Sequence, residues 1–238
     1  MIVLFAVSWS GGKDCCSAYW KAVSEGFDVQ YLLNTYREDS ERVAFHGVRA
    51  ELIRRQAKAL GKTLVQKTVG YSDYEETFFG ALVELKSKGV EGMIFGDIDV
   101  RQNREWCEDV TRRARLESVF PLWNMDQKKI IEEFIGAGFK AIVVALDSKF
   151  LTKDDLGRKI DQAWLRRIER LRIETESVPI TYCGENGEYH SFVFGGPIFK
   201  SDIKIRLGTT VRKDSHWLVD VLDSSDSDEA NFSTTSNI

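Results

Sequence analysis

One short segment near the N-terminus, residues 8–14, concentrates the side chains with the clearest chemical use. It follows an apolar run, and the hydroxyls of Ser8 and Ser10 precede the adjacent glycines Gly11 and Gly12. Adjacent glycines let the main chain adopt positive φ and let a ligand approach the backbone closely. The helix expected after them offers free N–H groups and the positive end of its dipole, which attract anions. This segment, called the glycine loop below, therefore predicts a binding site for a phosphate chain.

Lys13 and Asp14 complete the glycine loop with opposite charges. Lys13 is expected to be a mobile positive charge that neutralises phosphate, whereas the carboxylate of Asp14 would repel it. A Mg²⁺ ion held by Asp14 removes that repulsion, because Mg²⁺ is usually bound by one or two carboxylates together with substrate phosphates. The spacing matches neither the Walker A loop nor the dinucleotide G-x-G-x-x-G pattern. The alternative is a glycine turn that only starts a helix.

Strand and helix signals alternate through the first half of the chain. Apolar runs predict strands over residues 3–8, 29–34, 63–69 and 92–96, and helical spacing predicts helices over 13–24, 48–60, 74–88 and 104–116. Strands separated by helices of this length need right-handed crossovers, which produce a parallel sheet covered on both faces. Ligands of such sheets bind at the carboxyl ends of the strands. The glycine loop follows the first strand and is expected at that edge.

The character of the chain changes after residues 119–123. Helices are predicted over 127–135 and 155–172, and strands over 140–146, 191–199 and 216–222. We expect a nucleotide-binding domain over residues 1–122 and a smaller substrate domain over 123–222. Residues 223–238 are acidic, rich in Ser and Thr and nearly free of apolar side chains, so they are predicted to be disordered.

Composition and charge argue against a nucleic-acid-binding protein, a membrane-spanning protein and a disulfide-rich protein. The 238 residues carry a net charge of −4, which gives no general attraction to nucleic acid. Arginine clusters at 54–55, 112–115 and 166–172 lie in predicted helices, where solvated faces with i,i+4 ion pairs explain them. No apolar run approaches the roughly 18 residues of a membrane span. The 4 cysteines form no C-x-x-C pair, so we expect a reduced, cytoplasmic protein.

The motif "SGGKD" after the first strand resembles the PP-loop of the ATP pyrophosphatases, which cleave ATP between its α and β phosphates. The resemblance implies that residues 10–14 cradle the pyrophosphate part of ATP and that Lys13 and Asp14 take part in catalysis. The usual motif reads S-G-G-x-D-S/T. Cys15 stands where its last hydroxyl is expected, and a thiol is a weak hydrogen-bond donor.

Five further motifs resemble, in order, the diphthine-ammonia ligase family: "EGMIFGDID", "FPLW", "GAGFKAIVV", "LGRKID" and "CGENGEYHSFVFGGPIF". The resemblance implies an α/β fold, with a Rossmann-like (HUP-type) nucleotide domain and a smaller α+β C-terminal domain. It also implies a ligase that uses ATP and Mg²⁺ to adenylate the carboxylate of diphthine, a modified histidine on elongation factor 2. Ammonium then amidates the activated carbonyl, and AMP and pyrophosphate are released. Activation is needed because hydroxide is a poor leaving group.

The last motif supplies three further candidate catalytic residues, Glu185, Glu188 and His190. A loop of this composition can bind the substrate or position ammonia. Its alternative is a β-hairpin that turns at Asn186 and Gly187, because Asn-Gly is a strong hairpin signal. Both interpretations can hold together.

Two carboxylates and a histidine elsewhere have both functional and ordinary interpretations. Asp97 follows a buried strand and is expected near the glycine loop, where it would bind nucleotide, Mg²⁺ or ammonium. Asp99 is equally well explained as a helix N-cap. His46 precedes a helix and is either a general base or substrate ligand, or an ordinary residue near a helix start.

Several functions stay open at this point. Residues 34–52 resemble bacterial relatives in the family, so the acceptor could be another carboxylate, such as a corrinoid-related acid. A PP-loop enzyme that thiolates tRNA could use Cys107 and Cys183, and a non-catalytic sensor would hold ATP without turnover. The expected partners are ATP, ammonium and a carboxylate acceptor such as elongation factor 2. A homodimer is left open, whereas nucleic acid and membrane are not expected.

Overall fold

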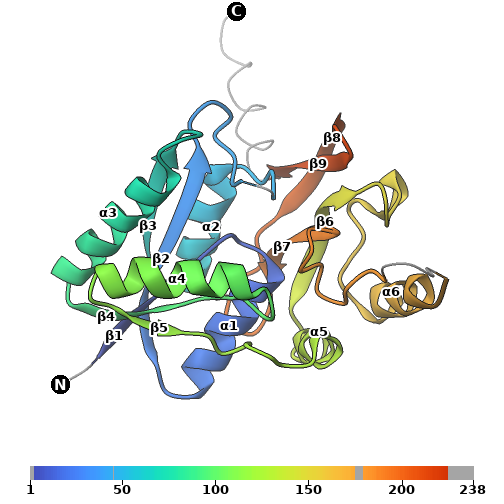
Figure 1. Cartoon of the computed structure of the whole chain (residues 1–238). Coiled ribbons are helices and arrows are strands. Elements are labelled where there is room, and N and C mark those ends of the chain that lie inside the picture. Colours follow the sequence, from blue (N-terminus) through green and yellow to red (C-terminus); the bar gives the residue numbers. More distant parts are fainter. Residues whose placement is uncertain (1–2, 45, 175–178, 225–238) are drawn as a thin grey trace, which may run out of the picture.

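The computed structural model describes residues 3–44, 46–174 and 179–224 and contains two β-sheets (Figure 1). The first sheet is entirely parallel and has the strand order β3-β2-β1-β4-β5. Its strands are β1 (Leu4–Ser8), β2 (Asp28–Arg37), β3 (Thr63–Val69), β4 (Val90–Ile94) and β5 (Glu117–Val119). The helices between them are α1 (Lys13–Ser24), α2 (Ala50–Leu60), α3 (Tyr74–Ser87) and α4 (Arg101–Arg113). This arrangement confirms the predicted Rossmann-like α/β fold.

The helices cover both faces of the first sheet. Ala6 in β1 packs in one cluster with Phe78 of α3 and Val110 of α4. Its neighbours Phe5 and Val7 belong to the other cluster, which contains the apolar residues of α1 and α2. Successive side chains of a strand point to opposite faces, and here both faces are covered. The unbroken apolar character of β1 follows from this double burial.

The strand order defines where a ligand can bind. The chain adds β2 and β3 on one side of β1 and then crosses over to add β4 and β5 on the other side. Beyond the carboxyl ends of β1 and β4, where the order reverses, an open parallel sheet leaves a crevice. The glycine loop connects β1 to α1 and lies at this switch point.

The second sheet is antiparallel and has the order β7-β6-β9-β8. Its strands are β6 (Lys140–Asp147), β7 (Tyr189–Gly195), β8 (Ile205–Lys213) and β9 (His216–Asp223), accompanied by α5 (Gln127–Gly136) and α6 (Gln162–Glu174). This sheet confirms the smaller α+β part of the predicted fold. The boundary between residues 122 and 123 stays a prediction, although the two sheets fall on either side of it.

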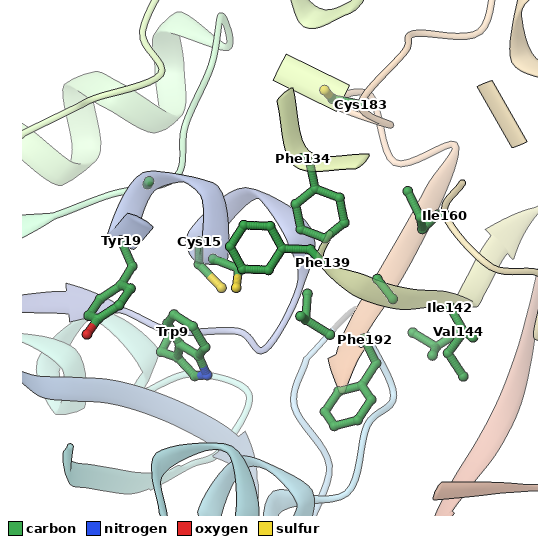
Figure 2. Packing of buried hydrophobic residues seen from close by; sticks show 14 of the residues in the cluster. Trp9, Cys15, Tyr19, Phe134, Phe139, Ile142, Val144, Ile160, Cys183 and Phe192 are labelled. Atoms are coloured by element: carbon green, nitrogen blue, oxygen red, sulfur yellow. The ribbon is translucent and has the colours of Figure 1, made fainter. Parts of the chain in front are cut away.

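A single apolar cluster joins the two sheets. It contains Trp9 and Tyr19 from the first part of the chain together with Phe134, Phe139 and Phe192 from the second (Figure 2). The ring of Phe139 stacks on that of Phe134, with a centroid separation of 4.8 Å. Helix α1 lies between the sheets and contacts both β7 and α5. The shared core therefore holds β7 against the start of α1.

The helix predicted over residues 155–172 is wrong in its first turns, because α6 begins only at Gln162. Asp155 instead ends a 3₁₀ turn, Lys153–Asp155, and its carboxylate receives hydrogen bonds from the Thr152 N–H and the Arg167 guanidinium. Gly157 then adopts a φ of 76°, which leaves helical geometry. A buried carboxylate, which the helical pattern did not reveal, organises this stretch.

Three strand predictions also need correction. The strand predicted over 191–199 is β7, which begins at Tyr189 and ends at Gly195. Strand β8 was missed because it is an edge strand whose side chains are mostly exposed, and its few apolar residues, Ile205, Leu207 and Val211, form no continuous apolar run. The hairpin predicted at Asn186 and Gly187 is wrong. A turn is present there, with Gly187 at a φ of 84°, but the described residues 179–185 form no strand before it.

The arginine cluster at 112–115 follows its simpler interpretation, whereas Arg167 of the cluster at 166–172 pairs with the buried Asp155. Arg112 pairs with Asp109, and Arg113 pairs with both Asp109 and Glu75. Of the tail predicted to be disordered, Asp223 ends β9, and residues 225–238 lie outside the described residues. Across the described part of the chain, no helix combines the length and apolar character needed to cross a membrane.

The ion pair of Asp155 should make stability depend on pH. Burial alone would raise the pKa of Asp155, but the bonds from Arg167 and Thr152 lower it below its ordinary value. A lowered folded-state pKa means that the stabilisation is present above the unfolded-state value of about 4 and is lost as pH falls through the folded-state value. We expect Asp155→Ala to reduce the unfolding free energy by about 3 kcal/mol at pH 7.

Urea unfolding at neutral and acid pH checks this expectation. The difference between wild type and Asp155→Ala should shrink below a pH of about 4, whereas Asp154→Ala, at an exposed neighbouring position, should leave stability nearly unchanged. A difference that stays constant with pH would contradict an ionised, paired Asp155.

Candidate functional site

The glycine loop has a geometry that its two glycines make possible. Gly11 has a φ of 84°, and a Cβ built on it would lie 2.6 Å from the Ile53 Cδ1 atom, so glycine is required. Gly12 is the N-cap of α1 and contributes no side-chain hydrogen bond to the helix. A Cβ on Gly12 would lie 2.7 Å from the His46 Cε1 atom. The main chain at the start of α1 therefore packs directly against neighbouring side chains, with no room for a Cβ atom. A loop that binds phosphate needs such close approach to its main chain.

Gln56 of α2 fixes the glycine loop in place. Its side chain is 0% exposed. The amide nitrogen donates to the Gly11 carbonyl at 3.0 Å and to the Val193 carbonyl of β7 at 2.6 Å, and the amide oxygen accepts from Trp9 Nε1 at 2.8 Å. Sequence reasoning missed this residue. The sequence did carry a signal for it, because a polar glutamine stands between Leu52 and Leu60 on the apolar face of the predicted helix.

Lys13, which the sequence predicts to be a mobile positive charge, is buried in this structure. It is 3% exposed, and its ammonium group lies 2.9 Å from Asp14 Oδ2, donates to the Cys183 carbonyl and sits 4.8 Å from the centroid of the Tyr189 ring. Burial favours the neutral amine, yet the charge of Asp14 and the other neighbours raise the pKa of Lys13 above its ordinary value. Lys13 is therefore a buried, permanently charged group. Its main-chain N–H donates to Ser191 Oγ at 3.1 Å.

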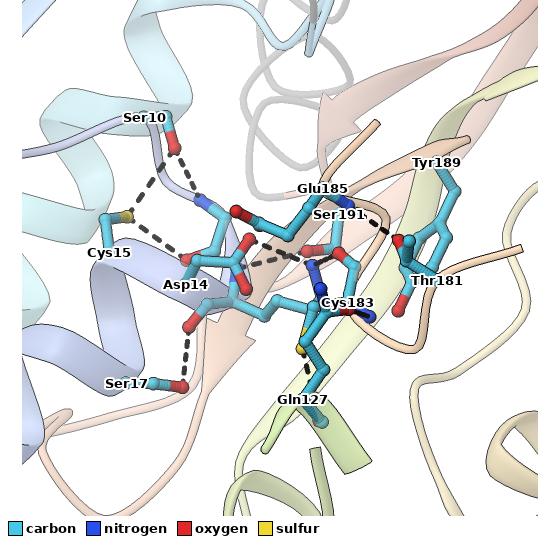
Figure 3. Close-up of polar contacts among 12 residues, drawn as sticks. Ser10, Asp14, Cys15, Ser17, Gln127, Thr181, Cys183, Glu185, Tyr189 and Ser191 are labelled. Atoms are coloured by element: carbon cyan, nitrogen blue, oxygen red, sulfur yellow. Dashed lines mark hydrogen bonds and ion pairs between the residues drawn. The ribbon is translucent and has the colours of Figure 1, made fainter. Parts of the chain in front are cut away.

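The loop before β7, residues 179–188, delivers Glu185 to the same place (Figure 3). Burial and then the negative charge of Asp14 raise the pKa of Glu185 to about 8. Asp99 and Asp97 contribute in the same direction. Near neutral pH the Glu185 carboxyl is therefore largely protonated, which suits a group that exchanges protons with a substrate.

Glu188 has a different environment from Glu185, although both were candidate catalytic residues. Its side chain is 1% exposed. One carboxylate oxygen accepts from the Thr181 N–H at 2.7 Å, and the other accepts from the Thr181 hydroxyl at 3.0 Å and the Asn186 N–H at 2.9 Å. With its lone pairs used in this way, Glu188 holds the loop in shape and supports Glu185 indirectly.

The carboxyl end of β4 supplies Asp97 and Asp99. Burial raises the pKa of Asp97, and the Cys107 thiol lies 3.9 Å from its Oδ2 atom. The N-cap interpretation of Asp99 is wrong, because Val100 caps α4, and Asp99 accepts a bond of 2.6 Å from Gln127 Nε2 instead. Gln127 Oε1 in turn accepts from the Cys183 N–H at 3.0 Å. Gln127, which sequence reasoning missed, thus connects the segment after β4 with the loop before β7.

His46 and His190 lie together beside the glycine loop. Their ring centroids are 4.8 Å apart, and His46 Nδ1 lies 3.1 Å from the Ser191 carbonyl oxygen. A carbonyl can only accept, so we assign the proton to Nδ1. Burial lowers the pKa of His46 to about 4. Burial and the neighbouring His46 lower the pKa of His190 well below its ordinary value, so both rings are neutral near pH 7.

A cavity of about 370 Å³ opens next to the glycine loop at the carboxyl ends of β1 and β2. Its volume falls within the range of about 300–1,000 Å³ that is typical of small-molecule sites. Both histidines, the loop serines Ser8 and Ser10, and polar and aromatic groups from β2 and α3 line it. The residues not anticipated from sequence are Asn34, Thr35, Arg37, Tyr74 and Phe78. The cavity suits the base and ribose of a nucleotide whose phosphates reach the glycine loop.

The donor set around Asp14 fits a magnesium ion that is bound jointly with phosphate. Within the described residues, no group of three or more His, Cys, Asp or Glu side chains is placed to hold a metal alone. The Asp14 Oδ1 atom, however, is buried and has no hydrogen-bond partner among those residues. An orphaned carboxylate oxygen beside a phosphate loop is what Mg²⁺ needs from a protein when substrate phosphates supply further ligands.

The thiols do not favour sulfur-transfer chemistry. Burial, and then the charge of Asp97, raise the pKa of Cys107, and burial raises that of Cys183 well above its ordinary value. Persulfide chemistry needs thiolate character, which both groups lack. Cys15 is also buried, and its thiol donates to the Gly12 carbonyl at 3.1 Å.

Comparisons with known proteins identify the family of this chain. The family model described as "Diphthamide synthase N-terminal domain" matches residues 3–118, and "Diphthamide synthase C-terminal domain" matches residues 126–223. The diphthine--ammonia ligase of Danio rerio is 28% identical, with 85% of this chain and 86% of that protein covered. The human protein of the same name is 27% identical, with 82% and 79% covered.

Other similarities are partial. The diphthine--ammonia ligase of Schizosaccharomyces pombe is 27% identical over 82% of this chain, which spans only 34% of that protein. The crystal structure of a predicted subunit of tRNA methyltransferase from Methanocaldococcus jannaschii aligns with a TM-score of 0.44 at 16% identity, covering 84% of this chain and 100% of that one. The two family models match nearly all of the described residues, in the order expected for one protein. This chain belongs to the diphthamide synthase family.

Proposed function

We propose that this protein is an ATP-dependent amide ligase that adenylates a substrate carboxylate and amidates it with ammonium. The observation that carries the proposal is the meeting of two segments far apart in the sequence. The glycine loop and the loop that carries Glu185 lie around one buried cation, Lys13, next to a cavity of nucleotide size. The names of the relatives support diphthine as the acceptor, and the family resemblance implies that this diphthine is carried by elongation factor 2.

The proposed reaction has two steps, adenylation of the acceptor and then its amidation. A carboxylate oxygen of the acceptor attacks the α phosphorus of ATP, and pyrophosphate leaves. Ammonia then attacks the carbonyl of the acyl adenylate, AMP leaves with the bonding electron pair, and a proton is lost to form the amide. An adenylate is a far better leaving group than hydroxide, which explains the use of ATP.

The residues have separate proposed roles in these steps. The cavity holds adenosine, while the glycine loop, with Ser8 and Ser10, binds the β and γ phosphates. Asp14 Oδ1 would hold Mg²⁺, whose positive charge stabilises the leaving pyrophosphate. Lys13 would exchange its present partners for phosphate oxygens. Asp97 adds negative charge near Glu185, and His190 borders the cavity as a neutral donor or acceptor.

An acceptor screen tests the reaction class. The protein is incubated with ATP, Mg²⁺, ammonium and one acceptor at a time, namely elongation factor 2 that carries diphthine or a corrinoid-related acid. We expect release of AMP and pyrophosphate that depends on both ammonium and acceptor. Formation of ADP and phosphate would exclude the proposal, and tight ATP binding without AMP under every condition would indicate a sensor.

Cys15→Ser should improve nucleotide binding. The thiol of Cys15, in the first turn of α1, contacts the glycine loop, 3.1 Å from the Gly12 carbonyl and 3.6 Å from Ser10 Oγ. A serine hydroxyl is a stronger donor and can bond to a phosphate oxygen. We expect the half-saturating ATP concentration to fall about fivefold, which corresponds to about 1 kcal/mol for one net hydrogen bond.

Steady-state kinetics of AMP release measure this effect, with Cys16→Ser as the control. Cys16 is 0% exposed, so its replacement buries a hydroxyl in the apolar core and should lower stability without changing the dependence on ATP. An unchanged ATP dependence in Cys15→Ser would remove residue 15 from the phosphate site.

Glu185→Gln should separate function from stability. A carboxyl with a folded-state pKa of about 8 loses its proton at a cost to the folded state, so wild-type stability falls as pH rises from the ordinary carboxyl value through about 8. Glutamine removes that cost. We therefore expect the variant to match wild type near pH 5 and to melt at a higher temperature than wild type above a pH of about 8.

Turnover should move in the opposite direction, because the variant no longer exchanges a proton at this position. Thermal melts across this pH range and AMP release give the two measurements. Glu117→Gln, at an exposed carboxyl on β5, is the control and should change neither. Parallel stability curves for wild type and Glu185→Gln would refute the raised pKa.

A further inference from the structure

The ammonium group of Lys13 occupies a closed chamber built from both halves of the chain. Its walls are the Asp14 carboxylate, with Oδ2 at 2.9 Å, the Cys183 carbonyl oxygen and the face of the Tyr189 ring at 4.8 Å. A carboxylate, a carbonyl and an aromatic face are the three kinds of group that replace water around an ammonium ion. We call these three walls, from Asp14, Cys183 and Tyr189, the ammonium chamber.

Two of the three walls, Cys183 and Tyr189, are held by residues behind them. The Cys183 main chain is oriented by its N–H bond of 3.0 Å to Gln127 Oε1, and its thiol donates to the Gln127 carbonyl at 3.4 Å. The Tyr189 hydroxyl donates to the Tyr182 carbonyl at 2.6 Å, and the Trp164 ring meets the Tyr189 ring edge-on at 5.0 Å. The carbonyl and aromatic walls are therefore preorganised without Lys13, whereas the Asp14 carboxylate is bonded to Lys13 through Oδ2.

The occupant of the chamber is also the residue that the nucleotide needs. Lys13 begins α1 in the loop proposed to bind pyrophosphate, so the ammonium group that now fills the chamber is also the group proposed to move to the phosphates. The flexible four-carbon stem of a lysine side chain lets its ammonium group change position. If the Lys13 side chain turned toward the phosphates, it would leave a cavity that is shielded from water. The carboxylate, the carbonyl and the aromatic face around that cavity would suit another cation.

We propose that the ammonium chamber binds the ammonium substrate once Lys13 turns toward the leaving pyrophosphate. The ε-ammonium of Lys13 and free ammonium are the same kind of ion, compact, strongly hydrated and rich in N–H donors. The chamber adjoins Glu185, so the nitrogen nucleophile would be held beside a carboxyl group. This inference rests on the proposed amidation for its biological meaning but not for its first test.

The first test needs no turnover. Lys13→Ala empties the chamber, whereas Lys13→Met removes the charge but keeps an apolar side chain in the same space. Thermal unfolding is followed in ammonium chloride and in sodium chloride of equal ionic strength. We expect ammonium, relative to sodium, to raise the melting temperature of Lys13→Ala saturably by about 3 °C, and to leave wild type and Lys13→Met unchanged. Equal responses in all three proteins would overturn the proposal.

The second test uses the ammonium dependence of AMP release. Tyr189→Leu removes the aromatic face, and Tyr189→Phe keeps it while losing only the hydroxyl bond to Tyr182. The half-saturating ammonium concentration should rise roughly tenfold in Tyr189→Leu and stay near wild type in Tyr189→Phe, with the ATP dependence equal in both. Equal ammonium dependence in the two variants would contradict the chamber.

The two tests distinguish failure of the chamber from failure of the proposed function. If wild type releases no AMP with any acceptor, the ligase proposal fails, and the thermal response of Lys13→Ala still decides whether the chamber binds ammonium. If wild type turns over normally but neither variant pair differs, the ligase stands and the chamber proposal is wrong.

Discussion

The carbonyl oxygen of Gly11 accepts hydrogen bonds from two distant parts of the molecule, and the shape of the site depends on this junction. The Val193 N–H of β7 donates to it at 2.9 Å and the Gln56 amide donates at 3.0 Å. The same amide nitrogen reaches the Val193 carbonyl, and Trp9 satisfies the amide oxygen. Each of these polar groups is buried, and leaving one unpaired costs about 1–3 kcal/mol. The glycine loop is therefore positioned by helix α2 and by the second sheet, as well as by its own glycines.

A second connection between the halves involves the segment that carries His46. Arg42 and Arg49, which flank His46 in the chain, both pair with Asp220 of β9, at 2.9 Å and 2.7 Å. Single exposed ion pairs contribute little, but here two guanidinium groups share one carboxylate that is only 14% exposed. The segment that carries His46 is thereby attached to the sheet that carries His190. The wall of the cavity belongs to both halves of the chain.

Burial sets the protonation state of the site. Lys13 stays charged because Asp14 compensates it, whereas His46 and His190 are held neutral and Glu185 is largely protonated near neutral pH. Lys13, a cation compensated by Asp14, thus lies near groups whose charges are suppressed by burial. An arriving polyanion and a metal ion would change this balance strongly, because charge interactions are less screened here than in water. Binding and proton transfer are coupled in such a site.

The sequence by itself determined the parallel α/β sheet, the position of the glycine loop after its first strand and the family resemblance. These features arise from local signals, namely apolar period, glycine placement and motif order, which are written in neighbouring residues. It could not show that Lys13 is buried, that Glu188 is structural or that Gln56, Gln127 and Tyr189 belong to the site.

The burial of Lys13 and the place of Gln56 come from contacts between residues more than a hundred positions apart, namely Lys13 with Cys183 and Gln56 with Val193. Glu188 contacts residues close to it in the chain, but its burial also depends on the tertiary fold. Strand β8 and the turn at Asp155 were misjudged for a related reason, since an exposed edge and a buried ion pair leave no periodic trace. Burial, and with it charge state, is decided only when the two sheets close on one core. The sequence therefore indicated many residue types of the site, but tertiary packing set the protonation states and the contacts of these residues.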